Sequence, residues 1–141
     1  MVWLEPNSDA GSGDILRALT ELGLPMGSHR IKHMARALFS AAMKHCAVMI
    51  GNSSAGIIEA ASFGTPVVNV GDRQNLRERN SNVKDVATDA ASIHLAIENA
   101  LSAGKVPCDN RYGDGRAGPR ISSHLMVLSL DRSVLSKCNS Y

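Results

Sequence analysis

The sequence of 141 residues lacks the features of a membrane or exported protein. It has no run of about eighteen apolar residues, which excludes a membrane-spanning helix. The start, Met1 followed by Val2 and Trp3, has neither the basic region nor the long apolar stretch of a signal peptide and looks like a strand instead. We therefore expect a cytoplasmic protein without a membrane partner.

Strong charge and metal-binding patterns are also missing. The 15 basic and 13 acidic residues give a net charge of only +2 and are scattered, so we expect no nucleic-acid partner. The three cysteines are far apart and form no C-x-x-C pair, which is typical of reduced thiols in a cytosolic protein. The five histidines show no spacing typical of a metal site. We expect neither a metal nor a cofactor.

Short apolar runs alternate with helical patterns along the chain. The runs predict strands over residues 2–4, 28–33, 46–50, 66–71 and 83–86. Apolar residues at helical spacing predict helices over residues 14–22, 35–44, 56–63, 89–101 and 119–128. This alternation favours an α/β fold with a doubly wound parallel sheet flanked by helices, in which the strand over residues 46–50 is covered on both faces. We expect one domain over residues 1–128 and a tail over residues 129–141.

Ligands of such sheets bind beyond the carboxyl ends of the strands. One loop at such a position, residues 51–56 (GNSSAG), leads into a helix and is called the serine loop below. Gly51 and Gly56 allow a close approach of backbone to ligand, while Ser53, Ser54 and the amides of the helix start attract a phosphate. The alternative is that a serine only caps the helix. The loop is neither a P-loop nor a Gly-x-Gly-x-x-Gly fingerprint.

Two charged side chains extend this candidate site. Glu59 is expected about one turn into the helix, where its carboxylate can accept hydrogen bonds from vicinal hydroxyls such as those of a ribose. Arg73 follows the next strand and is expected at the same sheet edge, where a guanidinium can hold a phosphate. The alternatives are a solvated glutamate and a surface arginine. Arg77 and Arg79 are weaker candidates for the same role.

Residues 51–59 (GNSSAGIIE) and 63–74 (FGTPVVNVGDRQ) resemble the UDP-N-acetylglucosamine 2-epimerase family. Residues 6–12 and 112–115 fit the same family, and the Gly-Asp-Arg-Gln segment is more similar to the hydrolysing branch of sialic acid biosynthesis. The resemblance implies the Rossmann-like, UDP-binding C-terminal half of a GT-B fold. The sequence departs from the family at Leu76, where glycine is frequent.

The resemblance also implies roles for individual residues. Ser53 and Ser54 would contact phosphate oxygens together with the amides up to Gly56, Glu59 would bind the ribose, and Arg73 would hold the diphosphate. Asn7 would line the nucleotide pocket. The implied reaction eliminates UDP from UDP-N-acetylglucosamine to give a glycal-like intermediate, which water attacks to leave N-acetylmannosamine.

The acid and base that handle the C2 proton come, in the family, from the N-terminal domain, to which nothing in this sequence corresponds. We therefore expect no catalytic residue in this chain. A noncatalytic nucleotide-binding fragment is one alternative, and another GT-B enzyme, such as a non-hydrolysing epimerase or a glycosyltransferase, is a second. An apolar surface made for a missing half would favour self-association, so a homo-oligomer is one expected state.

Overall fold

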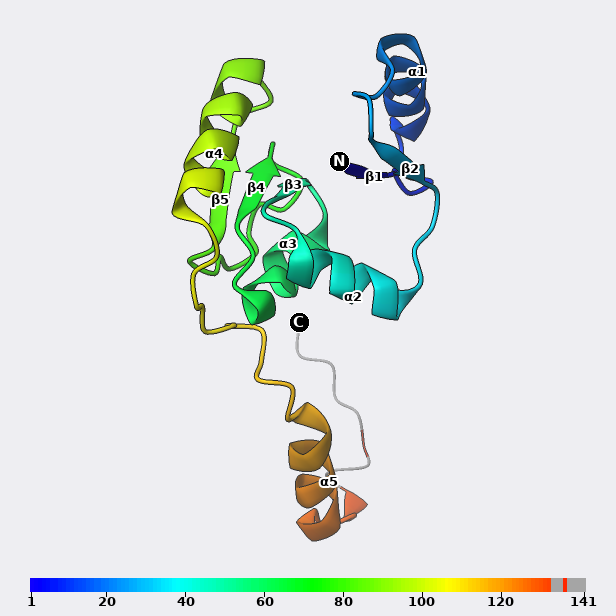
Figure 1. Cartoon of the computed structure of the whole chain (residues 1–141). Helices are drawn as coiled ribbons and strands as arrows, with labels where there is room; N and C mark the ends of the chain where they lie inside the picture. The colour runs from blue at the N-terminus through cyan, green and yellow to red at the C-terminus, as the bar shows by residue number, and fades with distance from the viewer. Residues whose placement is uncertain (133–135, 137–141) are drawn as a thin grey trace. The chain divides into compact units, whose positions relative to one another are not determined.

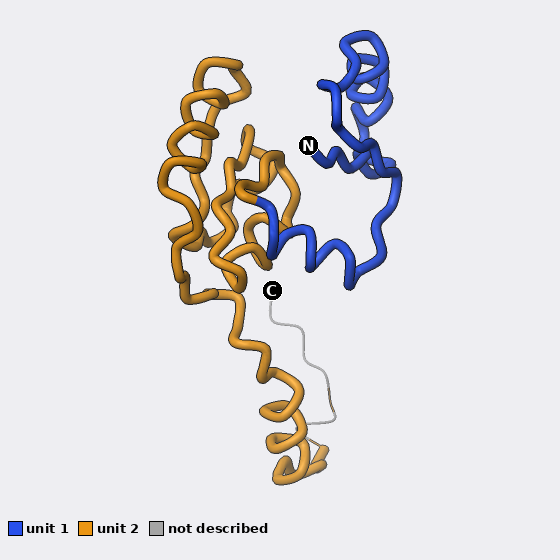
Figure 2. The backbone as a smooth tube through the Cα atoms, viewed as in Figure 1, with its two compact units in different colours: residues 1–46 blue, residues 47–141 orange. Residues whose placement is uncertain are grey.

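The computed structural model describes residues 1–132 and 136, and these residues form two compact units. The division falls after Cys46, between a helix and the next strand (Figure 2). Each unit is described by itself. Of the expected tail, residues 133–135 and 137–141 lie outside the described part of the chain, and the domain boundary at residue 128 stays a prediction.

The first unit is built around two parallel strands joined by a helix. Strand β1 (Val2–Leu4) pairs with β2 (His29–Ile31), and Val2 lies opposite His29. Helix α1 (Ser12–Leu22) connects the two strands, and α2 (Arg36–His45) follows β2. Leu19 is the buried residue of α1, as expected for a helix whose apolar positions recur on one side.

The second unit contains a parallel sheet of three strands in the order β3-β4-β5 (Figure 1). The strands are β3 (Met49–Gly51), β4 (Val67–Val70) and β5 (Val83–Val86). The helical elements are α3 (Ser54–Ile58), the 3-10 helix η1 (Ala60–Phe63), α4 (Ala90–Ala103) and α5 (Ala117–Val127). Parallel strands flanked by helices confirm the predicted α/β class.

The core of the second unit lies around its central strand. Val67, Val68 and Asn69 of β4 are all buried. Helix α3 packs against β3 and β4, and α4 packs against β4 and β5. The core positions outside β4 that these helical elements supply are mostly small: Ala55, Ile57, Ala60, Ala61 and Ala96. Small side chains let a helix pack closely against a sheet.

Two elements differ from the sequence prediction in more than their end residues. The strand expected over residues 46–50 is β3, over Met49–Gly51, and Ile50 on it is 46% exposed, so β3 is not covered on both faces. The helix expected over residues 56–63 begins at Ser54 and is interrupted at Glu59, where α3 gives way to η1. The side-chain amides of Asn80 and Asn110 donate hydrogen bonds to carbonyl oxygens at the end of α3. In a longer α-helix, these carbonyls would accept hydrogen bonds from backbone amides of the next turn.

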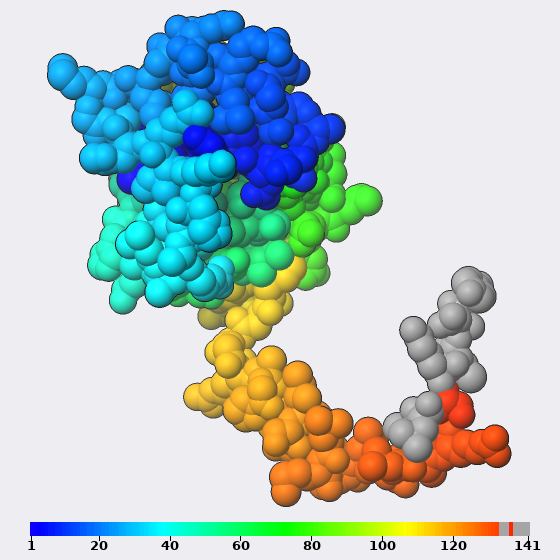
Figure 3. All heavy atoms as spheres, turned by 90° about the vertical axis from the view of Figure 1, so that its right-hand side faces the viewer, coloured from blue at the N-terminus to red at the C-terminus, as the bar shows by residue number. Residues whose placement is uncertain are grey.

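Helix α5 presents all of its residues to solvent (Figure 3). Its exposed apolar residues include Ile121, Leu125, Met126 and Val127. Within the residues that the structure describes, no helix has both the length and the apolar character needed to cross a bilayer.

Candidate functional site

The serine loop and the loop that follows β4 leave the same edge of the sheet. Strands β3 and β4 are parallel neighbours, with Gly51 opposite Asn69, so their carboxyl ends meet. The loop over residues 71–80, called the arginine loop below, starts directly after β4. Nη1 of Arg73 donates a hydrogen bond to the carbonyl oxygen of Asn52 over 3.2 Å. The two loops are therefore in direct contact.

Gln74 reinforces this contact and was not singled out from the sequence. Its Nε2 donates to the same carbonyl oxygen of Asn52 at 2.8 Å, and the side chain is buried. In sequence, a glutamine in a polar loop looks like any surface residue. The one indication of a functional role was its position directly after Arg73 in residues 63–74, the segment that resembles the family. Two donors on one carbonyl oxygen fix the backbone of the serine loop at Asn52.

Ser53 is the N-cap residue of α3. Its hydroxyl oxygen accepts a hydrogen bond from the backbone N–H of Ala55 at 3.3 Å, and the side chain is exposed. Ser54 begins the helix and is half-buried. The capping role is thus present, and it leaves the Ser53 hydroxyl at the surface next to the first amides of the helix. Contact of either serine with a phosphate stays a prediction.

Gly56 serves the packing of α3 onto β4. The residue is buried, and a Cβ atom placed on it would lie 2.9 Å from Cγ1 of Val67. Gly51 instead meets the conformational demand of the turn, because its φ of 137° is one that other residues rarely adopt. The sequence assigned both glycines to close backbone approach. At Gly56 the backbone closely approaches the neighbouring strand β4. Close approach of either glycine to a ligand stays a prediction.

Glu59 lies at the junction between α3 and η1 rather than in an early turn of a longer helix. It is the C-cap residue of α3, and its backbone N–H donates to the carbonyl of Ala55 at 2.9 Å. The side chain is half-buried. Its role at a ribose stays a prediction. Asn7 belongs to the other unit, where it lies exposed in the loop after β1.

Two asparagines that sequence reasoning missed brace the end of α3. Asn80 is buried and donates through Nδ2 to the carbonyl of Ile57 at 3.1 Å. Asn110 donates to the carbonyl of Ile58 at 2.8 Å, and its own Oδ1 accepts from Asn80 at 3.3 Å. The backbone beside Glu59 is consequently held by segments that are distant in sequence. No local pattern marks such asparagines, because they resemble turn formers.

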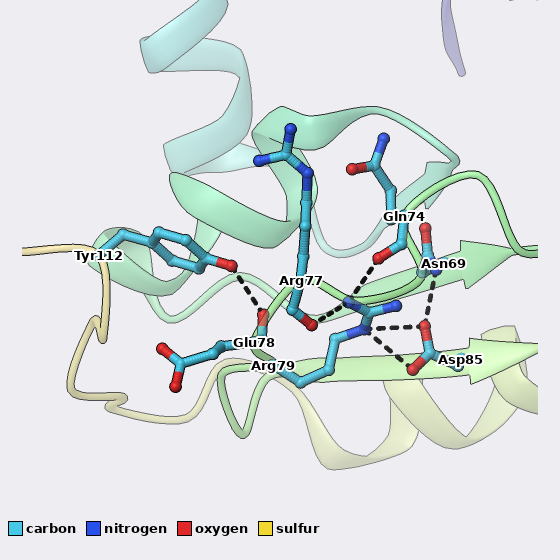
Figure 4. A network of polar contacts seen from close by, with 7 residues as sticks. All are labelled: Asn69, Gln74, Arg77, Glu78, Arg79, Asp85 and Tyr112. Carbon is cyan, nitrogen blue, oxygen red and sulfur yellow. Dashed lines mark hydrogen bonds and ion pairs between the residues drawn. The ribbon is translucent and has the colours of Figure 1, made fainter. Parts of the chain in front are cut away.

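An ion pair anchors the arginine loop to the sheet (Figure 4). Nε of Arg79 donates to both carboxylate oxygens of Asp85 on β5, at 3.1 and 3.0 Å. Burial raises the pKa of the Asp85 carboxyl, but hydrogen bonds from Arg79 and Asn69 and the charge of Arg79 outweigh burial and leave this pKa below its ordinary value. On the other side of the loop, the hydroxyl of Tyr112 donates to the carbonyl of Glu78 at 2.9 Å. The loop is thus fixed at two points.

Acidic, histidine and cysteine side chains do not gather into a metal site in the described part of the chain. No group of three or more of them there could hold an ion. The side chains and backbone described above supply hydroxyls, amides and guanidinium groups at this edge of the sheet. These groups donate hydrogen bonds to anions, which suits a phosphate-bearing ligand.

Comparison with known proteins gives the family. A family model described as UDP-N-acetylglucosamine 2-epimerase matches residues 1–126. The UDP-N,N'-diacetylbacillosamine 2-epimerase (hydrolyzing) of Legionella pneumophila subsp. pneumophila is 44% identical to this chain, and the match covers the whole chain and 37% of the relative's length. The UDP-N-acetylglucosamine 2-epimerase of Neisseria meningitidis serogroup B is 32% identical, and this match covers 82% of the chain and 30% of the relative's length. A GDP/UDP-N,N'-diacetylbacillosamine 2-epimerase (hydrolyzing) of Campylobacter jejuni subsp. jejuni is 33% identical over 60% of the chain and 23% of its own length.

The chain therefore spans between 23% and 37% of the length of these relatives. The family model covers nearly all of the residues that the structure describes, including the serine loop, the arginine loop and their contact at Asn52. The chain belongs to the UDP-N-acetylglucosamine 2-epimerase family.

Proposed function

We propose that this chain supplies the UDP-binding half of a hydrolysing UDP-N-acetylglucosamine 2-epimerase, which releases UDP and N-acetylmannosamine. The observation that carries the proposal is the contact of Arg73 with the Asn52 carbonyl at 3.2 Å. This contact brings a guanidinium to the loop that holds the exposed hydroxyl of Ser53. A cation, hydroxyls and helix-start amides at one sheet edge form a binding site for a diphosphate.

The proposed role of these groups in the reaction is electrostatic. Negative charge grows on the diphosphate as the bond between UDP and the sugar breaks. Donors that are already in position stabilise this charge more in the transition state than in the ground state, and so increase the rate. In this proposal, Arg73 and the amides from Ser53 to Gly56 bind the departing diphosphate, Glu59 holds the ribose and Asn7 lines the nucleotide pocket. The groups that move the C2 proton belong to the N-terminal half of the enzyme.

Binding of UDP is the first test. Calorimetric titration of the 141-residue chain with UDP and with uridine should show that the diphosphate contributes most of the affinity. Binding of uridine and UDP with equal strength would contradict a diphosphate site at the serine loop. Light scattering of the same samples tests the predicted homo-oligomer separately.

Turnover is the second test, and it needs the remainder of the enzyme. A chimera joins this chain to the portion of the Legionella relative that lies outside the matched region. With UDP-N-acetylglucosamine, the folded chimera should release UDP and N-acetylmannosamine. A folded chimera that binds UDP and releases neither product would leave nucleotide binding intact and refute the epimerase assignment.

A second candidate substrate is favoured by one observation. The relative that is 44% identical over the whole chain is named for UDP-N,N'-diacetylbacillosamine, whereas the relative named for UDP-N-acetylglucosamine is 32% identical. Both sugars carry the same UDP, so the proposed contacts of this chain apply to either. Competition between the two UDP-sugars in the chimera, followed by product analysis, decides which one the enzyme prefers.

The thiols support the predicted location. Among the residues that the structure describes, Cys108 is a free cysteine, and the thiol of Cys46 donates a hydrogen bond to the carbonyl oxygen of Met43 at 3.4 Å. Free thiols are typical of reducing compartments, which supports the proposal that the enzyme works in the cytoplasm.

A further inference from the structure

The carboxylate of Asp85 is fixed to the centre of the sheet. Asp85 on β5 lies opposite Asn69 on β4 in the parallel register. Nδ2 of Asn69 donates to Oδ1 of Asp85 at 2.6 Å, and Asn69 is 1% exposed. A buried amide on the central strand has little freedom to move, so the carboxylate that it holds is a rigid anchor at the carboxyl edge of the sheet.

Arg79 carries this anchor into the arginine loop. While Nε of Arg79 binds Asp85, Nη1 donates to the backbone carbonyls of Gln74 at 2.9 Å and Arg77 at 2.7 Å. One planar guanidinium thereby ties two points of the loop backbone to the sheet. Figure 4 shows this guanidinium between the Asp85 carboxylate and the two carbonyls, whereas the side chain of Arg77 points away from them.

The loop that Arg79 holds has a conformation that needs support. Leu76, between the two bonded carbonyls, has a φ of 68°, in the left-handed region that favours glycine. Such a residue persists only where the surrounding contacts enforce its conformation. The same loop carries Arg73 and Gln74, both of which donate to the carbonyl of Asn52. The orientation of these two donors therefore depends on the loop backbone.

We propose that Arg79 and Asp85 are positioning residues of the nucleotide site: their ion pair holds the arginine loop so that Arg73 and Gln74 meet the serine loop. The proposal rests on the proposed function, since it concerns the binding of UDP at this edge. The pair acts through the backbone of the loop and makes no contact with the nucleotide itself. Its side chains are 23% and 51% exposed, so replacements at these two positions leave the buried core of the unit in place.

Replacement Asp85→Asn separates positioning from simple electrostatics. It removes a negative charge near the site, and charge alone would make the binding of UDP tighter. Loss of the anchor would instead misplace the donors of the arginine loop and weaken the binding of UDP, on the order of tenfold. The two effects have opposite signs, so the direction of the change identifies the mechanism.

The experiment measures the dissociation constants of UDP and uridine by calorimetry for the 141-residue chain and three variants. Asp85→Asn and Arg79→Lys, which keeps the positive charge and loses the planar fork, should both weaken UDP about tenfold and uridine much less. Glu98→Gln, on an exposed position of α4, removes the same charge as Asp85→Asn and should leave both constants within about twofold of wild type.

A second readout needs no ligand. The amide of Asn75 donates to the carbonyl of Asp72 within the arginine loop, and the amide of Gly71 donates to Val86 on the neighbouring strand. In Asp85→Asn and in Arg79→Lys, hydrogen exchange of the Asn75 amide should accelerate more than that of the Gly71 amide. If Asp85→Asn fails to fold, Arg79→Lys provides both readouts.

Each outcome decides a different question. Wild-type chain that does not bind UDP refutes the proposed function, and the positioning role with it. Wild-type chain that binds UDP while Asp85→Asn binds it equally or more tightly overturns the positioning role alone. Weaker UDP binding by Asp85→Asn and Arg79→Lys, with Glu98→Gln unchanged and exchange faster at Asn75, supports the proposal.

Discussion

Nη1 of Arg73 lies 3.2 Å from the carbonyl oxygen of Asn52, 21 residues earlier in the chain. The bond joins the loops after two neighbouring parallel strands. It places a guanidinium beside the start of α3, where the amide dipoles already favour an anion. The relationship gives the charge of Arg73 a defined position at the proposed diphosphate site.

We expect Arg73→Met to weaken the binding of UDP by about 10- to 100-fold, the range that corresponds to loss of a charged hydrogen bond. Uridine lacks the diphosphate, so its affinity should change little. Calorimetric titration with both ligands measures the difference. Arg17→Met, at an exposed position of α1, is the matched control and should bind UDP like wild type. Equal losses for UDP and uridine would show that Arg73 supports the fold of the pocket rather than the diphosphate.

Gly56→Ala should reduce the free energy of unfolding by about 1–3 kcal/mol, because the added methyl group would overpack the contact between α3 and β4. The new Cβ atom would lie 2.9 Å from Cγ1 of Val67. The double variant Gly56→Ala/Val67→Ala should be more stable than the sum of the two single losses predicts, and urea unfolding measures this coupling.

Gly13→Ala is the control for Gly56→Ala. Gly13 lies in α1 with nothing within 4 Å of its added Cβ atom, so alanine there should raise the free energy of unfolding by about 0.4–1 kcal/mol. Strictly additive losses at Gly56 and Val67 would show that the two positions do not clash.

Leu76→Gly should stabilise the chain by about 0.5–1 kcal/mol, because relief of the left-handed backbone exceeds the added freedom of the unfolded glycine. Leu76 is fully exposed at a φ of 68°, so the change sacrifices no buried contact. Leu95→Gly, at an exposed position within α4, should destabilise by about 1 kcal/mol. Chemical denaturation compares the two, and a loss of stability in both variants would contradict strain at Leu76.

Protonation of Asp85 should make the free energy of unfolding depend on pH in the acid range. Burial raises the pKa of its carboxyl, but hydrogen bonds from Arg79 and Asn69 together with the charge of Arg79 leave this pKa below its ordinary value. A carboxyl whose pKa is depressed by folding stabilises the protein above its unfolded pKa, and this contribution is lost as pH falls through the folded pKa. The unfolding free energies of wild type and Asp85→Asn should therefore converge as pH falls below about 4. A constant difference between pH 7 and pH 2 would contradict this prediction.

The order of elements was largely predictable because its signals are local. The apolar residues Val67, Val68 and Val70 predicted β4, and Gly64 marked the end of the helical segment before it. The interruption of that segment at Glu59 was not predictable, since it depends on Asn80 and Asn110, which donate to carbonyls of α3 from 23 and 52 residues away. The exposure of Ile50 was not predictable either, because a continuous apolar run does not show which face of a strand other elements cover.

The sequence by itself determined the α/β class, the serine loop and the family-like segment that contains Arg73, because hydrophobic periodicity, glycine placement and short motifs depend on neighbouring residues. Tertiary structure alone decided that Arg73 and Gln74 meet at the Asn52 carbonyl and that Asp85 holds Arg79. These contacts form only when the sheet brings the ends of β3, β4 and β5 to one edge. A hydrogen bond requires its donor and acceptor to lie within about 3 Å of each other in space. The number of residues between them in the sequence does not determine this distance.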